Sequence, residues 1–249
     1  MTLNETARNY AGATAHYEAG RPSYPAALIA ALPLAQARCV VDLGAGTGKF
    51  TRLLLPHLAP GAEIVAVEPV AEMSRKLEGL AQLRVLNRTA SDTGLAAGAA
   101  DLVTCAQAFH WFDDAASVAE IARILRPGGT LALIWNMRDD RVDWVDALSR
   151  LIDGHAGDTP RHQSGHWRWI LKDARFRPVG ERTADYPHVL PRQGLFDRVL
   201  STSYIAALPA PEQDRLRAQV QGILDRHGLG QADQITLPYV SRLYLLERV

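Results

Sequence analysis

The fold class of this chain is decided by residues 41–50, which read VDLGAGTGKF. An apolar strand is predicted at residues 39–43, and a helix is predicted over residues 49–58, where apolar side chains recur at helical spacing. The glycines between these elements let the backbone approach a ligand closely, and the helix N-terminus presents free N–H groups. The segment therefore predicts a ligand-binding turn between a strand and a helix.

Strands and helices alternate through the first half of the chain. Further strands are predicted at residues 63–68, 83–87, 101–106 and 130–135. Helices are predicted at residues 70–80 and after an N-cap at Asp113 or Asp114. Strands separated by single helices need right-handed crossovers and form a parallel sheet covered on both faces. The predicted fold class is therefore α/β, with a Rossmann-like sheet.

The second half of the chain departs from this alternation. Residues 137–180 mix tryptophan and histidine with Gly, Asp and Arg, which indicates helices and loops inserted over the sheet. A helix is predicted at residues 212–227, and a long terminal strand at residues 234–248. We expect one domain over residues 1–249, with these parts: a helical cover (1–32), a ligand-binding core (33–136), a cap insertion with strand six (137–233) and a terminal strand (234–249).

Composition excludes several classes of protein. The 27 basic and 27 acidic residues balance, so the chain lacks the broad positive charge of a nucleic-acid binder. No apolar run approaches the roughly 18 residues that span a membrane, and no secretory signal is expected, so the cytoplasm is the expected location. Cys39 and Cys105 lie in apolar runs and are expected to be reduced. The sequence does not indicate an oligomeric state.

Three classes of ligand are bound by glycine turns of this kind. A nucleoside triphosphate loop has the pattern G-x-x-x-x-G-K-[ST], but here Phe50 follows Lys49, and Leu43 stands at the first glycine position. A dinucleotide fingerprint has the pattern G-x-G-x-x-G, but the third glycine comes one position early, at Gly48. Asp42 would also repel a pyrophosphate, because like charges about 4–6 Å apart repel appreciably. A ligand with an ammonium group is favoured instead.

S-adenosylmethionine is a ligand of this third class. It carries an ammonium group, has no phosphate, and presents a ribose diol to an acidic residue. Glu68, at the end of the second predicted strand, occupies the position of that acid.

Residues 16–136 resemble, in order along the chain, the class I S-adenosylmethionine-dependent methyltransferases. The resemblance rests on DLGAGTG at residues 42–48, Glu68-Pro69 with Met73 downstream, DLVTCAQAFHWFD at residues 101–113, and LRPGGTL at residues 125–131. QAFHWF at residues 107–112 and GRPSYP at residues 20–25 are similar to the small-molecule branch, which includes trans-aconitate and natural-product methyltransferases. The resemblance implies a seven-stranded, mostly parallel sheet with an antiparallel last strand.

The resemblance also implies which residues hold the cofactor. Gly44, Ala45 and Gly46 would lie along its methionine part, and Glu68 would accept hydrogen bonds from the ribose. The remaining implied contacts are Pro69 and Met73 at the adenine, Ala90 and Ser91 at the adenine edge, Ala106 and Gln107 near the sulfonium, and Arg21 with Tyr17 at the cofactor carboxylate.

The methyl acceptor is expected to be a small molecule. The segment after the fourth strand lacks the Asn/Asp-Pro-Pro-aromatic element that holds a flipped nucleic-acid base. It also lacks the carboxylates of a metal-dependent catechol-type enzyme, and Asp139 with Asp140 are read as helix-capping acids, so no metal is expected. His110 and Trp111 are the candidate catalytic residues. His110 is either a general base or a packing side chain.

Two acceptor chemistries remain open. Tryptophans and histidines in the cap suit a planar nitrogen heterocycle, whereas nearby arginines suit a polycarboxylate such as aconitate. The candidate acceptor-binding residues are Phe109, Asn136, Trp167 and Trp169. The leading hypothesis is methyl transfer to an N or O atom of a small metabolite, with a planar nitrogen heterocycle of a natural-product pathway as the favoured acceptor. O-methylation of a small carboxylic acid is the alternative acceptor chemistry. A nicotinamide-dependent oxidoreductase and a non-catalytic cofactor-binding regulator are the alternatives.

Overall fold

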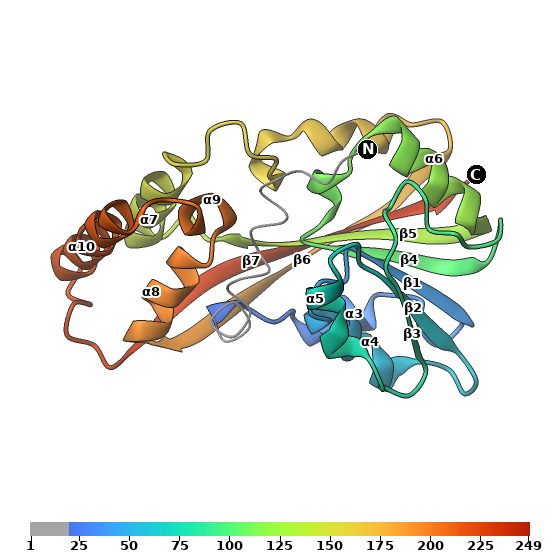
Figure 1. Cartoon of the computed structure of the whole chain (residues 1–249), viewed down its shortest axis with the longest axis horizontal. Helices are drawn as coiled ribbons and strands as arrows, with labels where there is room; N and C mark the ends of the chain where they lie inside the picture. The colour runs from blue at the N-terminus through green and yellow to red at the C-terminus, as the bar shows by residue number, and fades with distance from the viewer. Residues whose placement is uncertain (1–19) are drawn as a thin grey trace. The chain divides into compact units, whose positions relative to one another are not determined.

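A seven-stranded sheet runs through residues 20–249, which the computed structural model describes (Figure 1). The strand order is β3-β2-β1-β4-β5-β7-β6. The neighbouring strands from β3 to β5 pair in parallel, and the last strands run antiparallel. The bounds are β1 (Cys39–Leu43), β2 (Glu63–Val67), β3 (Leu83–Leu86), β4 (Ala100–Ala106), β5 (Leu125–Arg138), β6 (Phe176–Pro191) and β7 (Gln234–Arg248). This sheet confirms the predicted fold class.

The helices that connect these strands are short in the first half of the chain and longer in the second. Their bounds are α3 (Ala26–Ala30), α4 (Lys49–Leu54), η2 (Leu55–His57), α5 (Ala71–Ser74), η3 (Arg75–Leu77), η4 (Phe109–Trp111), α6 (Ala115–Ile124), α7 (Asp143–Asp153), η5 (His162–Ser164), η6 (His166–Lys172), α8 (Arg192–Leu200), α9 (Ser203–Ala206) and α10 (Ala210–Arg226). Of the helices described, none is long and apolar enough to cross a membrane.

The chain forms two compact units. One comprises residues 24–136, 160–184 and 241–249, and the other comprises residues 20–23, 137–159 and 185–240. In the first unit, α3 and α4 lie on one side of the sheet and α6 on the other (Figure 1). In the second unit, α7, α8, α9 and α10 pack their apolar faces into a separate core. The predicted cap is divided between the two units, because residues 160–184 belong with the first.

The parallel strands are buried on both faces, which explains their continuous apolar runs. Four of the five residues of β1 are buried, and Val41 pairs with Val65 of β2 and Val103 of β4. Gly48 has a φ of 84°, and a Cβ there would lie 1.9 Å from Cδ2 of Leu77. Glycine at this position therefore lets the start of α4 pack directly against η3.

Strand β6 was not located from the sequence, and residues 176–180 belong to it rather than to a loop. The strand lies at the edge of the sheet, and most of its side chains are exposed or half-buried. An exposed edge strand carries no apolar alternation, and it tolerates prolines such as Pro178 and Pro187. The terminal strand, in contrast, has the predicted bounds, since its buried side chains alternate.

Candidate functional site

The carboxyl ends of β1, β2 and β4 bring the predicted cofactor residues to one edge of the sheet. Asp42 pairs with Ala66 of β2 and Thr104 of β4, so the three strands end in register. The glycine turn, Glu68 and Gln107 follow directly after these ends. Open α/β sheets bind ligands at this edge. All of these residues belong to the first compact unit.

The carboxylate of Glu68 joins the ends of β1 and β2. Its Oε2 accepts a hydrogen bond from the Gly46 N–H at 2.9 Å, and its Oε1 accepts one from the Val70 N–H at 2.9 Å. Burial raises the pKa of Glu68, and the two N–H groups partly offset that rise. Each carboxylate oxygen can accept a further hydrogen bond. The group is thus held by the turn and can still accept hydroxyl donors.

The backbone of Gly46 and the side chain of Met73 lie close together beside this carboxylate. Gly46 has a φ of 58°, and a Cβ built on it would come within 3.4 Å of the Met73 methyl carbon. The Met73 side chain is nearly buried. A flexible thioether can follow the contour of a flat ring. The chain therefore places a carboxylate, a bare backbone and a soft apolar side chain together, which fits the ribose and adenine of the predicted cofactor.

Asp42 has a structural role that the sequence did not predict. Its carboxylate is 1% exposed and accepts hydrogen bonds from the hydroxyls of Thr51 at 2.6 Å and Thr104 at 2.7 Å. Burial raises the pKa of Asp42 to about 6, although both hydroxyls act to lower it. The side chain therefore ties β1 to α4 and β4. Both oxygens of this carboxylate are thus engaged by hydroxyls within the core.

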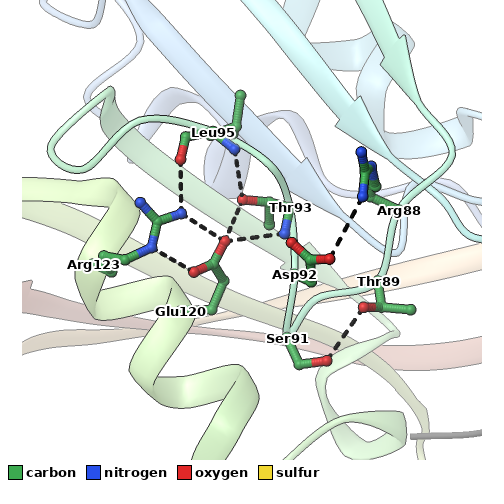
Figure 2. A network of polar contacts seen from close by, with 8 residues as sticks. All are labelled: Arg88, Thr89, Ser91, Asp92, Thr93, Leu95, Glu120 and Arg123. Atoms are coloured by element: carbon green, nitrogen blue, oxygen red, sulfur yellow. Dashed lines mark hydrogen bonds and ion pairs between the residues drawn. The ribbon is translucent and has the colours of Figure 1, made fainter.

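The loop after β3 is held by a polar network that sequence reasoning missed (Figure 2). Glu120 of α6 accepts hydrogen bonds from the N–H of Thr93 at 3.0 Å and from its hydroxyl at 2.5 Å. Arg123 bonds Glu120 at 2.6 Å and donates to the carbonyl of Leu95 at 2.7 Å. Arg123 is the main cause that lowers the pKa of Glu120 to about 2. The Glu-x-x-Arg spacing on a helix was the available signal.

This network fixes the loop that carries Ala90 and Ser91. Ala90 is 9% exposed, and the Ser91 hydroxyl shares a 3.2 Å hydrogen bond with that of Thr89. The predicted adenine-edge residues therefore stand on a loop whose shape depends on α6.

The turn after β4 is strained and tied to β5. Gln107 has a φ of 55°, a conformation that non-glycine residues rarely adopt and that clusters at functional sites. Its side chain donates to the carbonyl of Asn136 at 2.8 Å, and the Asn136 side chain accepts from the Ser241 hydroxyl at 2.6 Å. Ala106, Gln107 and Asn136 are thus brought together. Phe109 is fully buried.

The indole of Trp135 fixes the proton of His110. The Trp135 Nε1–H can only donate, and it lies 3.2 Å from His110 Nδ1. Nδ1 is therefore the acceptor, and the proton of the neutral imidazole resides on Nε2. In this tautomer His110 donates from Nε2 and has no lone pair there to act as a base. The Trp111 ring lies 5.3 Å from the imidazole, measured between centroids.

Trp167 and Trp169 anchor the segment around η6. Trp167 is fully buried, and its ring centroid lies 4.5 Å from that of Trp135. The Trp169 indole donates to the carbonyl of Asp113 at 2.9 Å. Both tryptophans are therefore engaged in packing or bonding within the first unit. Tyr17 lies outside the described residues, and Arg21 belongs to the second unit, so their predicted contacts stay predictions.

Comparison with known proteins points to one family. Residues 41–133 match the model of a methyltransferase domain. An uncharacterized methyltransferase of Mycobacterium tuberculosis is 39% identical over 235 residues, covering 94% of this chain and 93% of that protein. Trans-aconitate 2-methyltransferase of Azoarcus is 38% identical over 108 residues, covering 43% of this chain and 42% of that protein. A solved structure from Anaeromyxobacter dehalogenans, assigned as a type II methyltransferase, has a TM-score of 0.68 at 22% identity, covering 92% of this chain and 97% of that one.

Proposed function

Since the chain belongs to the class I S-adenosylmethionine-dependent methyltransferases, we propose that it transfers a methyl group to an N or O atom of a small metabolite. The observation that carries this proposal is the Glu68 carboxylate, held by Gly46 and Val70 beside the glycine turn. An acid in this position recognises a ribose diol. We also propose a cytoplasmic location, in keeping with the free thiols of Cys39 and Cys105.

S-adenosylmethionine, when bound, supplies a methyl group that is already electrophilic because it is attached to a sulfonium. We propose that Gly44, Ala45 and Gly46 hold its methionine part and that Glu68 accepts from its ribose. The remaining proposed contacts are Pro69 and Met73 at the adenine, Ala90 and Ser91 at its edge, Ala106 and Gln107 near the sulfonium, and Tyr17 with Arg21 at the carboxylate. The chain then has to align the acceptor and exclude water.

His110 is proposed to orient the acceptor as a hydrogen-bond donor. The Trp135 bond to Nδ1 supports this role, since it fixes the proton on Nε2. A base would need the opposite arrangement, in which the indole N–H loses its acceptor. Trp111, Phe109 and Asn136 are proposed to complete the acceptor site. Trp167 and Trp169 are proposed to hold the surrounding segment in place, Trp167 by packing and Trp169 by its hydrogen bond.

Between the two candidate acceptors, a planar heterocycle and a small carboxylic acid, we propose the acid. A partial relative acts on trans-aconitate, and arginines gather around η5 and η6. These observations favour an acid over a planar heterocycle, because Trp167 is already packed against other rings.

Two measurements test the proposed function. Calorimetry with S-adenosylmethionine, S-adenosylhomocysteine and NAD should show binding of the first two only. Incubation with radiolabelled S-adenosylmethionine and a library of amines, phenols and carboxylic acids should then label one class. Binding of NAD without the other two would favour the oxidoreductase, and cofactor binding without transfer to any class would favour a non-catalytic regulator.

A further inference from the structure

A group of buried polar atoms around η5 has no partner. Within residues 20–249, no hydrogen-bond partner is found for Nη1 of Arg161, for either ring nitrogen of His162, for Nε of Arg242 or for the hydroxyl of Tyr244. All four residues belong to the first compact unit. Buried polar atoms without partners are costly, so such a cluster calls for an explanation.

Two of these side chains, His162 and Tyr244, pack against tryptophan rings. The His162 ring lies 4.8 Å from Trp135 and 5.2 Å from Trp167, measured between centroids. Tyr244 lies 4.9 Å from Trp167, and its neighbour two positions earlier on β7, Arg242, shares its face of the strand. Arg242 also acts on the His162 imidazole electrostatically. The unpartnered atoms of His162, Arg242 and Tyr244 therefore belong to one neighbourhood, and Arg161 directly precedes His162 in the chain.

The charge of this cluster is positive and poorly balanced. Arg161, Arg168 and Arg242 supply three guanidinium groups, and Arg168 lies 5.3 Å from the Trp167 ring. Among the described residues, the ion pair formed by these arginines is that of Arg242 with Glu181, at 3.9 Å. Burial, followed by Arg168 and Arg242, lowers the pKa of His162 to about 4, so the imidazole is neutral.

We propose that Arg161, His162, Arg242 and Tyr244 bind the anionic group of the methyl acceptor, a carboxylate or a phosphate. The guanidinium, hydroxyl and imidazole N–H groups are all donors, which an oxygen-rich anion satisfies together. The inference rests on the proposed function, because it takes the ligand to be the acceptor. Trp135 connects this cluster to His110 in the proposed acceptor site, since its ring contacts His162 and its indole N–H bonds His110.

Anion binding can be measured without turnover. Citrate and orthophosphate serve as the carboxylate and phosphate probes, titrated by calorimetry with and without saturating S-adenosylhomocysteine. We expect one or both to bind, and the stronger probe identifies the anion. Arg242→Gln should weaken binding at least about 10-fold, because it removes a charge-assisted donor. Arg177→Gln is the matched control, since Arg177 is an exposed arginine of the same unit that pairs with Glu247.

Two further variants protect the test against misfolding. Arg168→Gln changes an exposed side chain and should weaken binding about 3-fold through lost charge alone. Tyr244→Phe should weaken binding while leaving the melting temperature unchanged or higher, because it deletes a hydroxyl that has no partner in the free protein.

Several results would overturn the proposal. The first is that neither probe binds, and the second is that Arg242→Gln and Arg177→Gln weaken binding equally. The third is that Tyr244→Phe lowers the melting temperature without changing probe binding, which would indicate that the Tyr244 hydroxyl bonds a structural water. Loss of probe binding when S-adenosylhomocysteine is present would assign the cluster to the cofactor carboxylate instead. If S-adenosylhomocysteine itself does not bind, the proposed function fails, whereas the probes alone still report on the anion site.

Discussion

Replacing Glu68 by glutamine tests the proposed cofactor site most directly. The carboxylate accepts one backbone N–H on each oxygen, both at 2.9 Å. An amide keeps one of these acceptors, and its NH₂ group must then face the other N–H. It also loses the charge that strengthens bonds from the ribose hydroxyls. One charge-assisted bond contributes about 1.5–3 kcal/mol, so affinity for S-adenosylhomocysteine should fall about 10- to 100-fold.

Calorimetry on two variants and two ligands separates the ribose contact from damage to the turn. Glu63→Gln is the control, because Glu63 begins β2, the strand that Glu68 follows, and its side chain is 48% exposed and forms a 3.7 Å ion pair with Arg84. It should leave affinity unchanged, since exposed pairs contribute little. The penalty of Glu68→Gln should shrink for the 2′,3′-dideoxy analogue of S-adenosylhomocysteine. Equal affinity of Glu68→Gln and the native protein would refute the reasoning, and an equal penalty for both ligands would assign Glu68 to the turn alone.

Three other changes have defined outcomes. The folded-state pKa of Asp42 is raised to about 6, so the stability of the native protein relative to Asp42→Asn should be greatest below about pH 4. It should fall by up to about 3 kcal/mol as pH rises to 7; a constant difference in urea titrations would contradict this. Glu120 has its pKa lowered to about 2, so Glu120→Gln should destabilise the protein by about 1–3 kcal/mol at neutral pH, and this difference should disappear as pH falls toward 2. Amide hydrogen exchange in residues 89–95 should also become faster in this variant. Unchanged exchange in this loop would count against the network. If His110 is a donor, His110→Gln should keep most of the turnover while His110→Ala loses about 10-fold, whereas a base would make both lose about 100-fold or more.

Much of the sheet was predictable because its strands are buried on both faces. Continuous apolar runs at β1, β2 and β4 indicate strands buried on both faces, and the alternation in β7 indicates a strand whose side chains are alternately buried. The helices were less predictable in length. The predicted helix at 70–80 is instead α5 and η3, which cover residues 71–77 together. Short amphipathic segments gain their stability from packing, so their ends depend on neighbours that a local pattern does not contain.

The site was predictable where backbone geometry decides it. Glycines at positive φ and an acid at the end of the next strand are signals that the sequence displays directly. The network of Glu120 with Thr93 was not found, because its partners are 27 positions apart and meet only when α6 packs beside the loop. The hydrogen bonds of Asp42 were not predicted for the same reason, since Thr51 and Thr104 reach it from other elements.

For the aromatic residues of this chain, core packing and a role beside the site do not exclude one another. Trp135 is fully buried and packs on Trp167, as a core residue does. Its one polar atom nevertheless bonds His110 and determines which ring nitrogen carries the proton. A buried indole must satisfy its N–H, and here the available acceptor is a candidate catalytic side chain. The requirement of the core therefore sets the chemistry open to His110, which is why burial alone does not separate structural from functional residues in this chain.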